Sequence, residues 1–308
     1  ACGVCGTDFH IYRGEAPARP PVILGHEYFG EIVATGREVE GLGPGDIVAI
    51  DPNIPCGECY FCRIGKPHLC ESSHALGVTI DGGFAEYSVA PASQCHKLPG
   101  GVNMATGVFV EPVACCLHGI DLAGIRPGNT VVILGAGTIG LILMQLARLS
   151  GASELIVSDP LPDRRNLAVT LGATRAVDSE NEDLAGVVRT VSPAGADVVI
   201  EAVGMAKTVK AAIELAARGG TVLIFGVSPE GLTIPVSPFE IYKKELKIQG
   251  SYVNPYTSSR AVKMLVTGQV EVEALAGRRI SLAALPDLLK SERGQGGAKT
   301  LVVPSASC

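Results

Sequence analysis

Hydrophobic and polar positions divide this chain into three stretches of different character. In residues 1–112, short apolar runs such as 83–91 are separated by glycine and proline turn signals. This pattern predicts small, irregular β structure. Residues 253–308 have a similar mixed pattern, with a helix predicted over 258–267 and a final apolar run at 300–303.

The middle stretch, residues 113–252, has a different periodicity. Apolar runs rich in Val and Ile recur with their starts between 20 and 24 residues apart, and helical patterns lie between them. Continuous apolar strands that alternate with helices are typical of a parallel sheet covered on both faces. The pattern therefore predicts a doubly wound α/β domain. The strands are expected to begin at Val131, Leu155, Ala176, Val198, Val222 and Leu246, and the helices to cover 140–150, 163–171, 182–191 and 207–218.

Composition and charge narrow the classes of protein. The 308 residues are 47% hydrophobic and 18% charged, which excludes a disordered chain or a coiled coil. The 25 Lys and Arg against 31 Asp and Glu give a net charge of −6 without a basic stripe, so nucleic acid is not an expected partner. The uncharged run at 131–147 approaches membrane-span length, but its glycines predict a strand, a turn and a helix instead. With no signal-peptide pattern at the start, we expect a cytoplasmic protein without a membrane partner.

A glycine-rich turn follows the first strand of the middle stretch. The segment VVILGAGTIG places G-x-G-x-x-G between that strand and a helix, which is the pattern of a dinucleotide-binding turn. Gly135 is expected to make the tight turn, Gly137 to let the backbone approach a pyrophosphate, and Gly140 to allow close helix–strand packing. Ile139 lies in the same turn and is expected to contact the cofactor. The alternative is an ordinary strand–helix turn.

An acidic residue ends the next strand. Asp159 lies 19 residues past Gly140, where a carboxylate can accept hydrogen bonds from both ribose hydroxyls of NAD and repel a 2′-phosphate. Alternatively, Asp159 could cap a helix ahead of Pro160. Arg164 and Arg165 follow closely and could tolerate NADP. NAD is therefore the expected cofactor, with Arg164 in the site, and NADP is the alternative.

Four of the ten cysteines are clustered in the sequence. Cys56, Cys59, Cys62 and Cys70 form a C-x2-C-x2-C-x7-C segment, which we call the four-cysteine lobe. In a chain expected to be cytoplasmic, such spacing favours metal over disulfides. Four thiolates predict a closed, tetrahedral, structural zinc site. Buried or disulfide-paired thiols are the alternative.

A second candidate metal site has a different composition. Cys5 lies at a glycine-flanked turn, and His26 and Glu27 follow 21 and 22 residues later. One thiolate, one imidazole and one carboxylate would leave a fourth position open for water or substrate, as in catalytic zinc sites. Taken alone, the pair of Cys5 and His26 could equally be a buried thiol and a core histidine. The neighbouring dinucleotide pattern favours the metal site.

Several segments, in this order, resemble the zinc-dependent medium-chain alcohol dehydrogenases, and within them the polyol (sorbitol-type) and threonine dehydrogenase branch. These segments are GVCGTDFHIY, GHEYFGEIVATG, the four-cysteine lobe, DGGFAEY, VEP and the GAGTIG turn. The resemblance covers essentially the whole chain. It implies a Rossmann NAD-binding domain, residues 113–252, inserted into a chaperonin-10-like (GroES-like), β-rich catalytic zinc domain, residues 1–112 and 253–308. Family members have further strands before the first zinc-ligand cysteine, so the N-terminal strands are expected to be missing here.

The resemblance also implies roles for individual residues at the catalytic zinc. Cys5, His26 and Glu27 match its ligands. Glu111 matches the acid that holds the zinc-bound water or the substrate in the polyol branch, and either Glu27 or Glu111 is the third ligand. Because classical alcohol dehydrogenases have a cysteine at this position, Glu111 favours the polyol branch.

Three further residues are assigned by the same resemblance. Thr7 and His10 match a proton relay, and Asp8 matches an acid that orients the site. The segment 250–257 replaces the arginine-bearing pattern of sorbitol dehydrogenases, which argues against sorbitol itself.

The implied function is reversible, NAD-linked oxidation of a secondary alcohol, a polyol or sugar alcohol, to a ketone, with two zinc ions per chain. The alternatives are an L-threonine 3-dehydrogenase or a butanediol-type dehydrogenase. A more distant alternative is a non-catalytic, zinc-stabilised dinucleotide-binding protein. A homo-oligomer, either a dimer or a tetramer, is expected.

Overall fold

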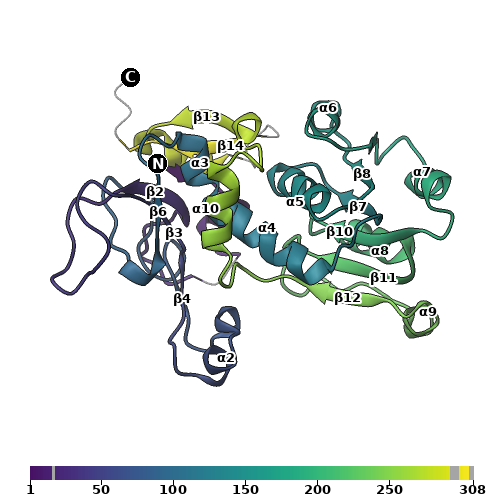
Figure 1. Cartoon of the computed structure of the whole chain (residues 1–308), viewed down its shortest axis with the longest axis horizontal. Helices are drawn as coiled ribbons and strands as arrows, with labels where there is room; N and C mark the ends of the chain where they lie inside the picture. The colour runs from purple at the N-terminus through teal and green to yellow at the C-terminus, as the bar shows by residue number, and fades with distance from the viewer. Residues whose placement is uncertain (16–17, 292–297, 305–308) are drawn as a thin grey trace. The chain divides into compact units, whose positions relative to one another are not determined.

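The computed structural model describes residues 1–15, 18–291 and 298–304. The chain divides into two compact units, one formed by Ala1–Cys115 with Val253–Cys308 and the other by Cys116–Tyr252. The helix α4 (Val110–Ala123) crosses this division (Figure 1). The boundary expected between residues 112 and 113 therefore falls inside a helix, slightly before the division in the structure. Each unit is described separately below.

The first unit is organised around a six-stranded sheet with the order β13-β14-β1-β2-β3-β6. Neighbouring strands are antiparallel except for β13 and β14, which are parallel. This arrangement brings the last strand of the chain beside the first. The strands are β1 (Cys2–Gly3), β2 (Glu27–Glu31), β3 (Ile47–Ile50), β6 (Cys95–Leu98), β13 (Ala276–Ile280) and β14 (Lys299–Val302).

Shorter elements surround this sheet. A small antiparallel pair, β4 (Asn53–Ile54) and β5 (His74–Ala75), flanks the four-cysteine lobe in the sequence. The core of the unit contains aliphatic and aromatic side chains from the sheet and from the helices α1 and α11, including Phe9, Val48 and Leu288. The helices are α1 (Gly6–Tyr12), α2 (Tyr60–Arg63), α3 (Met104–Val108), α10 (Ser258–Val266) and α11 (Leu285–Lys290), and the 3-10 turns are η1 (Pro67–Leu69), η2 (Ala92–Gln94), η3 (Glu273–Leu275) and η4 (Leu282–Ala284).

The apolar run at 83–91 forms no strand, contrary to the sequence prediction. The amides of Gly82, Gly83 and Phe84 donate hydrogen bonds to carbonyls within 23–25, but in the irregular order 23, 25, 24. A regular ladder needs partners in register. The close approach of two glycine-rich segments therefore takes the place of strand pairing.

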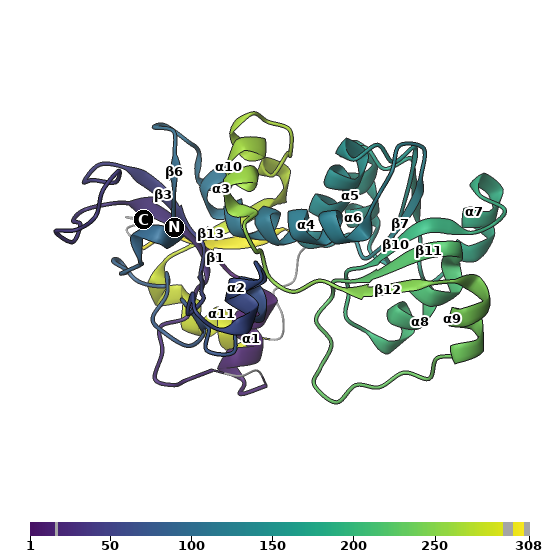
Figure 2. The same ribbon diagram turned by 60° about the horizontal axis from the view of Figure 1, so that its bottom comes forward.

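The second unit contains the predicted doubly wound parallel sheet. Its strand order is β12-β11-β10-β7-β8-β9, and all neighbouring pairs are parallel. Figure 2 shows α5 and α6 on one face of this sheet and α8 and α9 on the other. The strands are β7 (Thr130–Leu134), β8 (Glu154–Ser158), β9 (Arg175–Val177), β10 (Ala196–Glu201), β11 (Ala216–Ile224) and β12 (Lys247–Gly250), and the helices are α5 (Thr138–Leu149), α6 (Pro162–Thr170), α7 (Leu184–Val191), α8 (Ala206–Leu215) and α9 (Pro238–Lys244).

Helix α8 ends earlier than the sequence predicts. The expected helix over 207–218 stops at Leu215, and β11 begins at Ala216, which pairs with Ala196 of β10. Ala216 and Ala217 are buried in the sheet. Burial between strand neighbours here overrides the helical preference of alanine, which is only a weak determinant.

Among the described residues, no helix is long and apolar enough to cross a membrane. The uncharged run at 131–147 forms β7, the glycine turn and α5 instead, as predicted.

Candidate active site and metal centres

Cys5 is held at the N-terminus of α1. It is the N-cap residue in an extended conformation, and its backbone N–H donates to Asp8 Oδ2 at 2.8 Å. A carboxylate in the first turn also interacts favourably with the helix dipole. Cys5 Sγ lies 3.6 Å from Thr7 Oγ1, so the thiol and the hydroxyl share one side of the turn.

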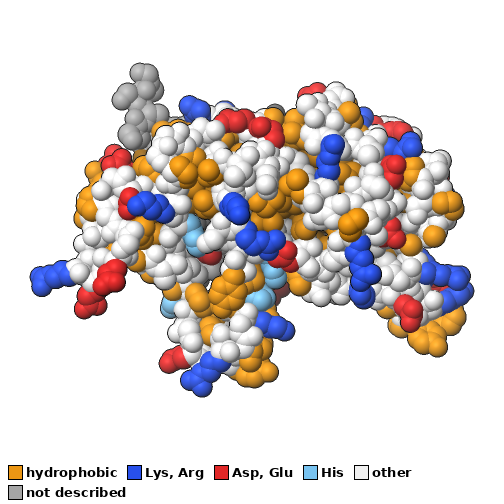
Figure 3. All heavy atoms as spheres, viewed as in Figure 1, with side chains coloured by type: hydrophobic (Ala, Val, Ile, Leu, Met, Phe, Trp, Pro, Cys, Tyr) orange, Lys and Arg blue, Asp and Glu red, His pale blue; other side chains and the backbone are white. Residues whose placement is uncertain are grey.

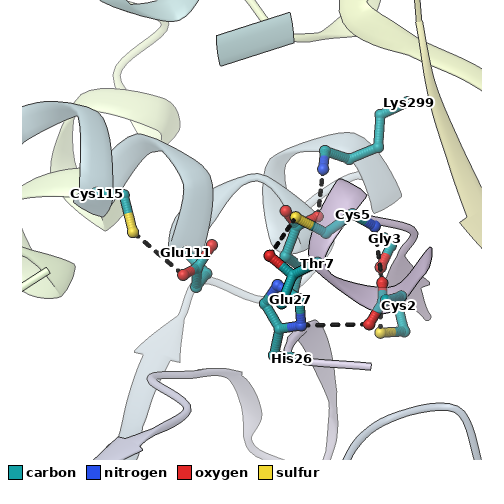
Figure 4. A network of polar contacts seen from close by, with 10 residues as sticks. Cys2, Gly3, Cys5, Thr7, His26, Glu27, Glu111, Cys115 and Lys299 are labelled. Atoms are coloured by element: carbon teal, nitrogen blue, oxygen red, sulfur yellow. Dashed lines mark hydrogen bonds and ion pairs between the residues drawn. The ribbon is translucent and has the colours of Figure 1, made fainter. Parts of the chain in front are cut away.

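Glu27 is the first residue of β2 and His26 directly precedes it, and both follow a glycine that no other residue could replace without rearrangement. Gly25 has φ +95°, and a Cβ there would meet Cys2 Sγ and the ring of Phe84 at 2.8 Å. The tight turn aims the next two side chains toward Cys5. The thiol, the imidazole and the carboxylate offer ligand atoms that all lie within 4.8 Å of one another, and His26 and Glu27 are buried (Figure 4).

Asp8 orients the imidazole. Its Oδ1 lies 3.4 Å from His26 Nδ1, and its side chain is fully buried. Burial lowers the pKa of His26, but the nearby Asp8 carboxylate and Cys5 thiolate outweigh burial and raise this pKa well above its usual value. With Nδ1 facing a carboxylate, Nε2 is the nitrogen available to a metal. A carboxylate behind a ligating histidine is typical of zinc sites.

Lys299 is a member of the site that the sequence analysis missed. This residue begins β14, and its ammonium group contacts Glu27 Oε2 (Figure 4). Its Nζ also lies 6.0 Å from the centre of the Phe109 ring. Burial alone would lower the pKa of Lys299, but Glu27 and Cys5 raise it above its usual value. The only sequence signal was a lysine at the edge of an apolar strand, and its partner lies 272 positions away.

Glu111 lies in the first turn of α4 and faces the same centre (Figure 4). Its Oε1 accepts a hydrogen bond from Cys115 Sγ at 3.2 Å. Burial, followed by the nearby negative charge of Glu27, raises the pKa of Glu111 to about 7. A carboxyl group with such a pKa can hold or release a proton near neutral pH.

His10 lies away from the buried ligands. It is one helical turn after Thr7 on α1, and its Nδ1 lies 2.7 Å from Glu15 Oε2. The imidazole is 28% exposed and Glu15 is half exposed, so this pair is in contact with solvent. His10 therefore has the access to water that the outer end of a proton relay needs.

The four-cysteine lobe brings its sulfur atoms together without disulfides. The four Sγ atoms lie within 4.8 Å of one another, and all four cysteines are free. Backbone N–H groups donate to two of them: Cys56 N to Cys70 Sγ and Cys59 N to Cys56 Sγ, both at 3.3 Å. Backbone N–H groups also lower the pKa of Cys59 to about 6. These backbone contacts favour the thiolate of Cys59, whereas burial and the Cys59 side chain raise the pKa of Cys62 to about 12.

Both clusters fit zinc by the chemistry of their donors. The lobe supplies four sulfur ligands and no other group, as in closed structural sites. The other cluster supplies one sulfur, one nitrogen and one carboxylate oxygen, which is the ligand number of catalytic sites. Around it, Asp8 and Lys299 contact the ligands themselves and so fix their orientation.

The glycine turn of the second unit has the geometry of a phosphate cradle. Gly135 has φ +99°, and a Cβ on Gly140 would collide with the carbonyl of Gly135. Gly137 is the N-cap of α5, and a Cβ there would meet nothing within 4 Å. The space beside Gly137 at the N-terminus of α5 is therefore open, as dinucleotide binding at this end of a helix requires.

Asp159 follows β8 beside that turn. Its Oδ2 accepts from Ala136 N at 2.9 Å, and its Oδ1 accepts from Leu161 N at the same distance. Arg164 Nη1 lies 3.4 Å from Asp159 Oδ2, whereas Arg165 is paired with Asp178 at 3.0 Å. The alternative role of Asp159 as a helix N-cap does not apply, since Leu161 is the N-cap residue of α6. Oδ1 accepts only one of these hydrogen bonds and has a second acceptor site for a further donor.

Comparisons with known proteins agree with this geometry. The family model of the alcohol dehydrogenase GroES-like domain matches residues 1–100, and that of zinc-binding dehydrogenases matches residues 138–267. D-arabinitol dehydrogenase 1 of Uromyces fabae is 34% identical over 99% of this chain and 88% of its own length. L-threonine 3-dehydrogenase of Pyrococcus furiosus is 37% identical over 79% of this chain and 71% of its own. A structure from Sinorhizobium meliloti 1021, described as a zinc-binding dehydrogenase with bound NADP, has 45% identity, a TM-score of 0.95, and coverage of 99% of this chain and 90% of that one.

Proposed function

This chain belongs to the zinc-dependent medium-chain alcohol dehydrogenase family, and from that premise we propose that it is a polyol dehydrogenase. It would oxidise a secondary hydroxyl of a sugar alcohol to a ketone, with reduction of a nicotinamide cofactor. The observation that carries this proposal is the composition of the buried centre. One thiolate and one imidazole are accompanied there by two carboxyl groups, Glu27 and Glu111.

Each side chain at this centre would have a separate role in the reaction. Cys5, His26 and Glu27 would hold a catalytic zinc, and Glu111 would hold the water or the substrate hydroxyl beside it. When bound, zinc supplies Lewis-acid polarisation of the hydroxyl and the nicotinamide supplies the hydride acceptor. Thr7 can pass a proton through its hydroxyl, and the solvent-exposed His10 can release a proton to water.

The same centre favours a polyol over L-threonine. An amino-acid substrate brings a carboxylate, which needs a cationic partner. Among the described residues at this centre the cation is Lys299, which already contacts Glu27, and Asp8 and Glu111 add further negative charge. Hydroxyl groups can donate hydrogen bonds to such carboxylates, whereas a substrate carboxylate would be repelled.

A substrate panel tests this proposal. Polyols, 2,3-butanediol and L-threonine are assayed with NAD and with NADP, before and after treatment with a zinc chelator. We expect chelator-sensitive oxidation of at least one polyol, with a higher kcat/KM than for L-threonine. Faster turnover of threonine, or turnover that survives loss of all zinc, would contradict the proposal.

We infer that NAD is preferred over NADP, although the Sinorhizobium relative was crystallised with NADP. The support is the position of Asp159, whose carboxylate would meet a 2′-phosphate with like charge. Arg164 is its counter-ion and offers an anchor for that phosphate once the carboxylate is gone. Asp159→Ala should therefore lower kcat/KM with NAD and raise it with NADP. A parent enzyme that already prefers NADP would refute the inference.

Two zinc ions per chain are proposed, one in each cysteine-containing cluster. The support is that both ligand sets converge in the first unit and differ in donor type. Metal analysis of the purified protein should give about two zinc ions per chain. A single zinc, or iron in the four-cysteine lobe, would contradict this assignment.

A homo-oligomer is proposed from the exposed edge of the second unit's sheet. All four residues of β12 are exposed, and this edge strand includes the apolar side chain of Ile248. Hydrophobic side chains are also visible at the corner where Figure 1 places α9 (Figure 3). An uncovered strand edge is a template for pairing with a second copy. Light scattering should give a dimer or tetramer, and Ile248→Asp should shift the mass downward.

A cytoplasmic location is proposed from the state of the thiols. The cysteines in the described part of the chain are free. Five of them belong to the two candidate metal-binding clusters, four in the four-cysteine lobe and Cys5 in the other. Such clusters persist where thiols are kept reduced. Cell fractionation of the native protein would test this location.

A further inference from the structure

Both side chains of the contact between Lys299 and Glu27 are buried. The side chain of Lys299 is 6% exposed and that of Glu27 is 2% exposed. The lysine is fixed by its backbone, because β14 pairs with β1 through the register Gly3↔Leu301 and Cys2↔Val302. A buried ammonium with a single carboxylate partner is costly unless it is well placed, so this contact requires an explanation.

The geometry divides the Glu27 carboxylate between two tasks. A carboxylate has two oxygens, and either one or both can bind a metal. Glu27 Oε2 contacts the Lys299 ammonium, and the centre of the Phe109 ring lies 6.0 Å from that ammonium. One oxygen of Glu27 is therefore held by the protein, which leaves the other for the metal.

We propose that Lys299 is a positioning residue that limits Glu27 to one metal bond and so keeps a coordination position open for the substrate. This inference rests on the proposed zinc site at Cys5, His26 and Glu27. Without the lysine, the released oxygen can also reach the metal and occupy the position that a substrate hydroxyl needs. The site would then resemble a closed structural site more than a catalytic one.

Charge balance points in the same direction. The described groups around the ligands are three carboxyl groups, Asp8, Glu27 and Glu111, and one thiol, Cys5. With His26 neutral as a metal ligand, the cation among the described side chains there is Lys299. When this cation is removed, the metal becomes the only positive charge among them. The metal should therefore bind more tightly in its absence, while turnover becomes slower.

Lys299→Met, which keeps an unbranched side chain of most of the original length and removes the charge, tests the inference. Zinc is replaced with Co²⁺, whose visible d–d absorption weakens as coordination rises from four to five, and affinity is measured by competition with a chelator. The four-cysteine lobe is the same in parent and variant, so its contribution cancels in the difference spectrum. We expect weaker absorption and a metal affinity higher by about 10-fold, the lower end of what residues around metal ligands typically contribute.

Matched variants keep the result interpretable if Lys299→Met folds poorly. Lys299→Arg retains the cation and should leave the Co²⁺ spectrum of the parent. Lys97→Met removes an exposed lysine that contacts Asp46 at 2.6 Å, and it should change neither reading. In Glu27→Gln/Lys299→Met, an amide group replaces the second oxygen of residue 27. Relative to Glu27→Gln alone, this double variant should show no gain in metal affinity.

The outcomes separate this inference from the proposed function. An unchanged spectrum together with unchanged or weaker metal affinity in Lys299→Met would overturn the inference, even if the parent oxidises polyols. A parent that binds no metal at Cys5, His26 and Glu27 would overturn both. Tighter binding with a changed spectrum supports the inference even if the substrate class is wrong.

Discussion

The two metal-binding clusters of the first unit are built in opposite ways. The four-cysteine lobe takes all its ligands from residues 56–70, and three of them are partly or fully exposed. The other cluster takes its ligands from the N-cap of α1 and from the start of β2 with the residue before it, and their partners come from α4 and β14. A site made from one short loop can fold around its metal. A site assembled from distant elements is positioned by the surrounding fold, so it can leave one coordination position of the metal open for a substrate.

The largest effect should follow from loss of a ligand in the assembled cluster. Cys5→Ser removes its only thiolate, while the sheet and the Asp8 contact to the backbone N–H of residue 5 remain. We expect kcat/KM to fall by more than about 100-fold, beyond what outer-shell changes typically cost, with little change in melting temperature. Steady-state kinetics and calorimetry measure the two quantities. A variant with near-parental activity would show that this cluster is not the catalytic one.

The lobe should respond in the opposite way. Cys59→Ser removes one of four sulfur ligands from a segment that has no buried helix of its own. Structural zinc contributes about 10–16 kcal/mol to the folding of small zinc peptides, so the loss should open the lobe and release about one zinc ion. Proteolysis within 56–70 and a lower melting temperature should reveal this opening. Unchanged protease resistance would indicate that the lobe is stable without metal.

This contrast also explains how much could be predicted from the sequence. The lobe and the glycine turn are local, so their spacing in the sequence was sufficient to identify them. The doubly wound sheet was predicted from strand and helix periodicity, and it is confirmed. By contrast, Lys299 could not be identified, because its partner Glu27 is distant in the sequence and is reached only through the pairing of β14 with β1 and of β1 with β2. The end of α8 was also predicted wrongly, since strand pairing overrode local preference at Ala216.

Glu111 offers a smaller and more specific test of the assembled cluster. Its carboxyl group is buried and has a pKa of about 7, but its removal leaves Cys5, His26 and Glu27 in place. Glu111→Ala should lower activity by roughly 10- to 100-fold, as for other partners around a metal site, without loss of cofactor binding. Kinetics, together with NADH fluorescence titration, would measure both. Activity equal to that of the parent would remove the main support for the polyol assignment.

The smallest expected effect concerns Cys115, whose thiol donates a hydrogen bond to Glu111. Removing this donor tests whether the hydrogen bond, and not burial alone, controls the ionisation of Glu111. Cys115 Sγ lies 3.2 Å from Glu111 Oε1, and this hydrogen bond favours the ionised carboxylate. Cys115→Val removes the donor at similar volume, so the pKa of Glu111 should rise above its parental value. A larger fraction of Glu111 is then protonated at pH 7, and any step that needs the carboxylate is slowed there.

A hydrogen bond of this kind contributes about 0.5–1.5 kcal/mol, which corresponds to roughly 2- to 10-fold in rate at neutral pH. The acidic limb of the kcat/KM profile should move to higher pH in Cys115→Val, and activity should recover as the pH is raised. Cys115→Ser keeps a donor at this position and should retain the parental profile. If both variants keep the parental acidic limb, the ionisation that controls catalysis belongs to another group, and Glu111 acts only through its bulk and burial.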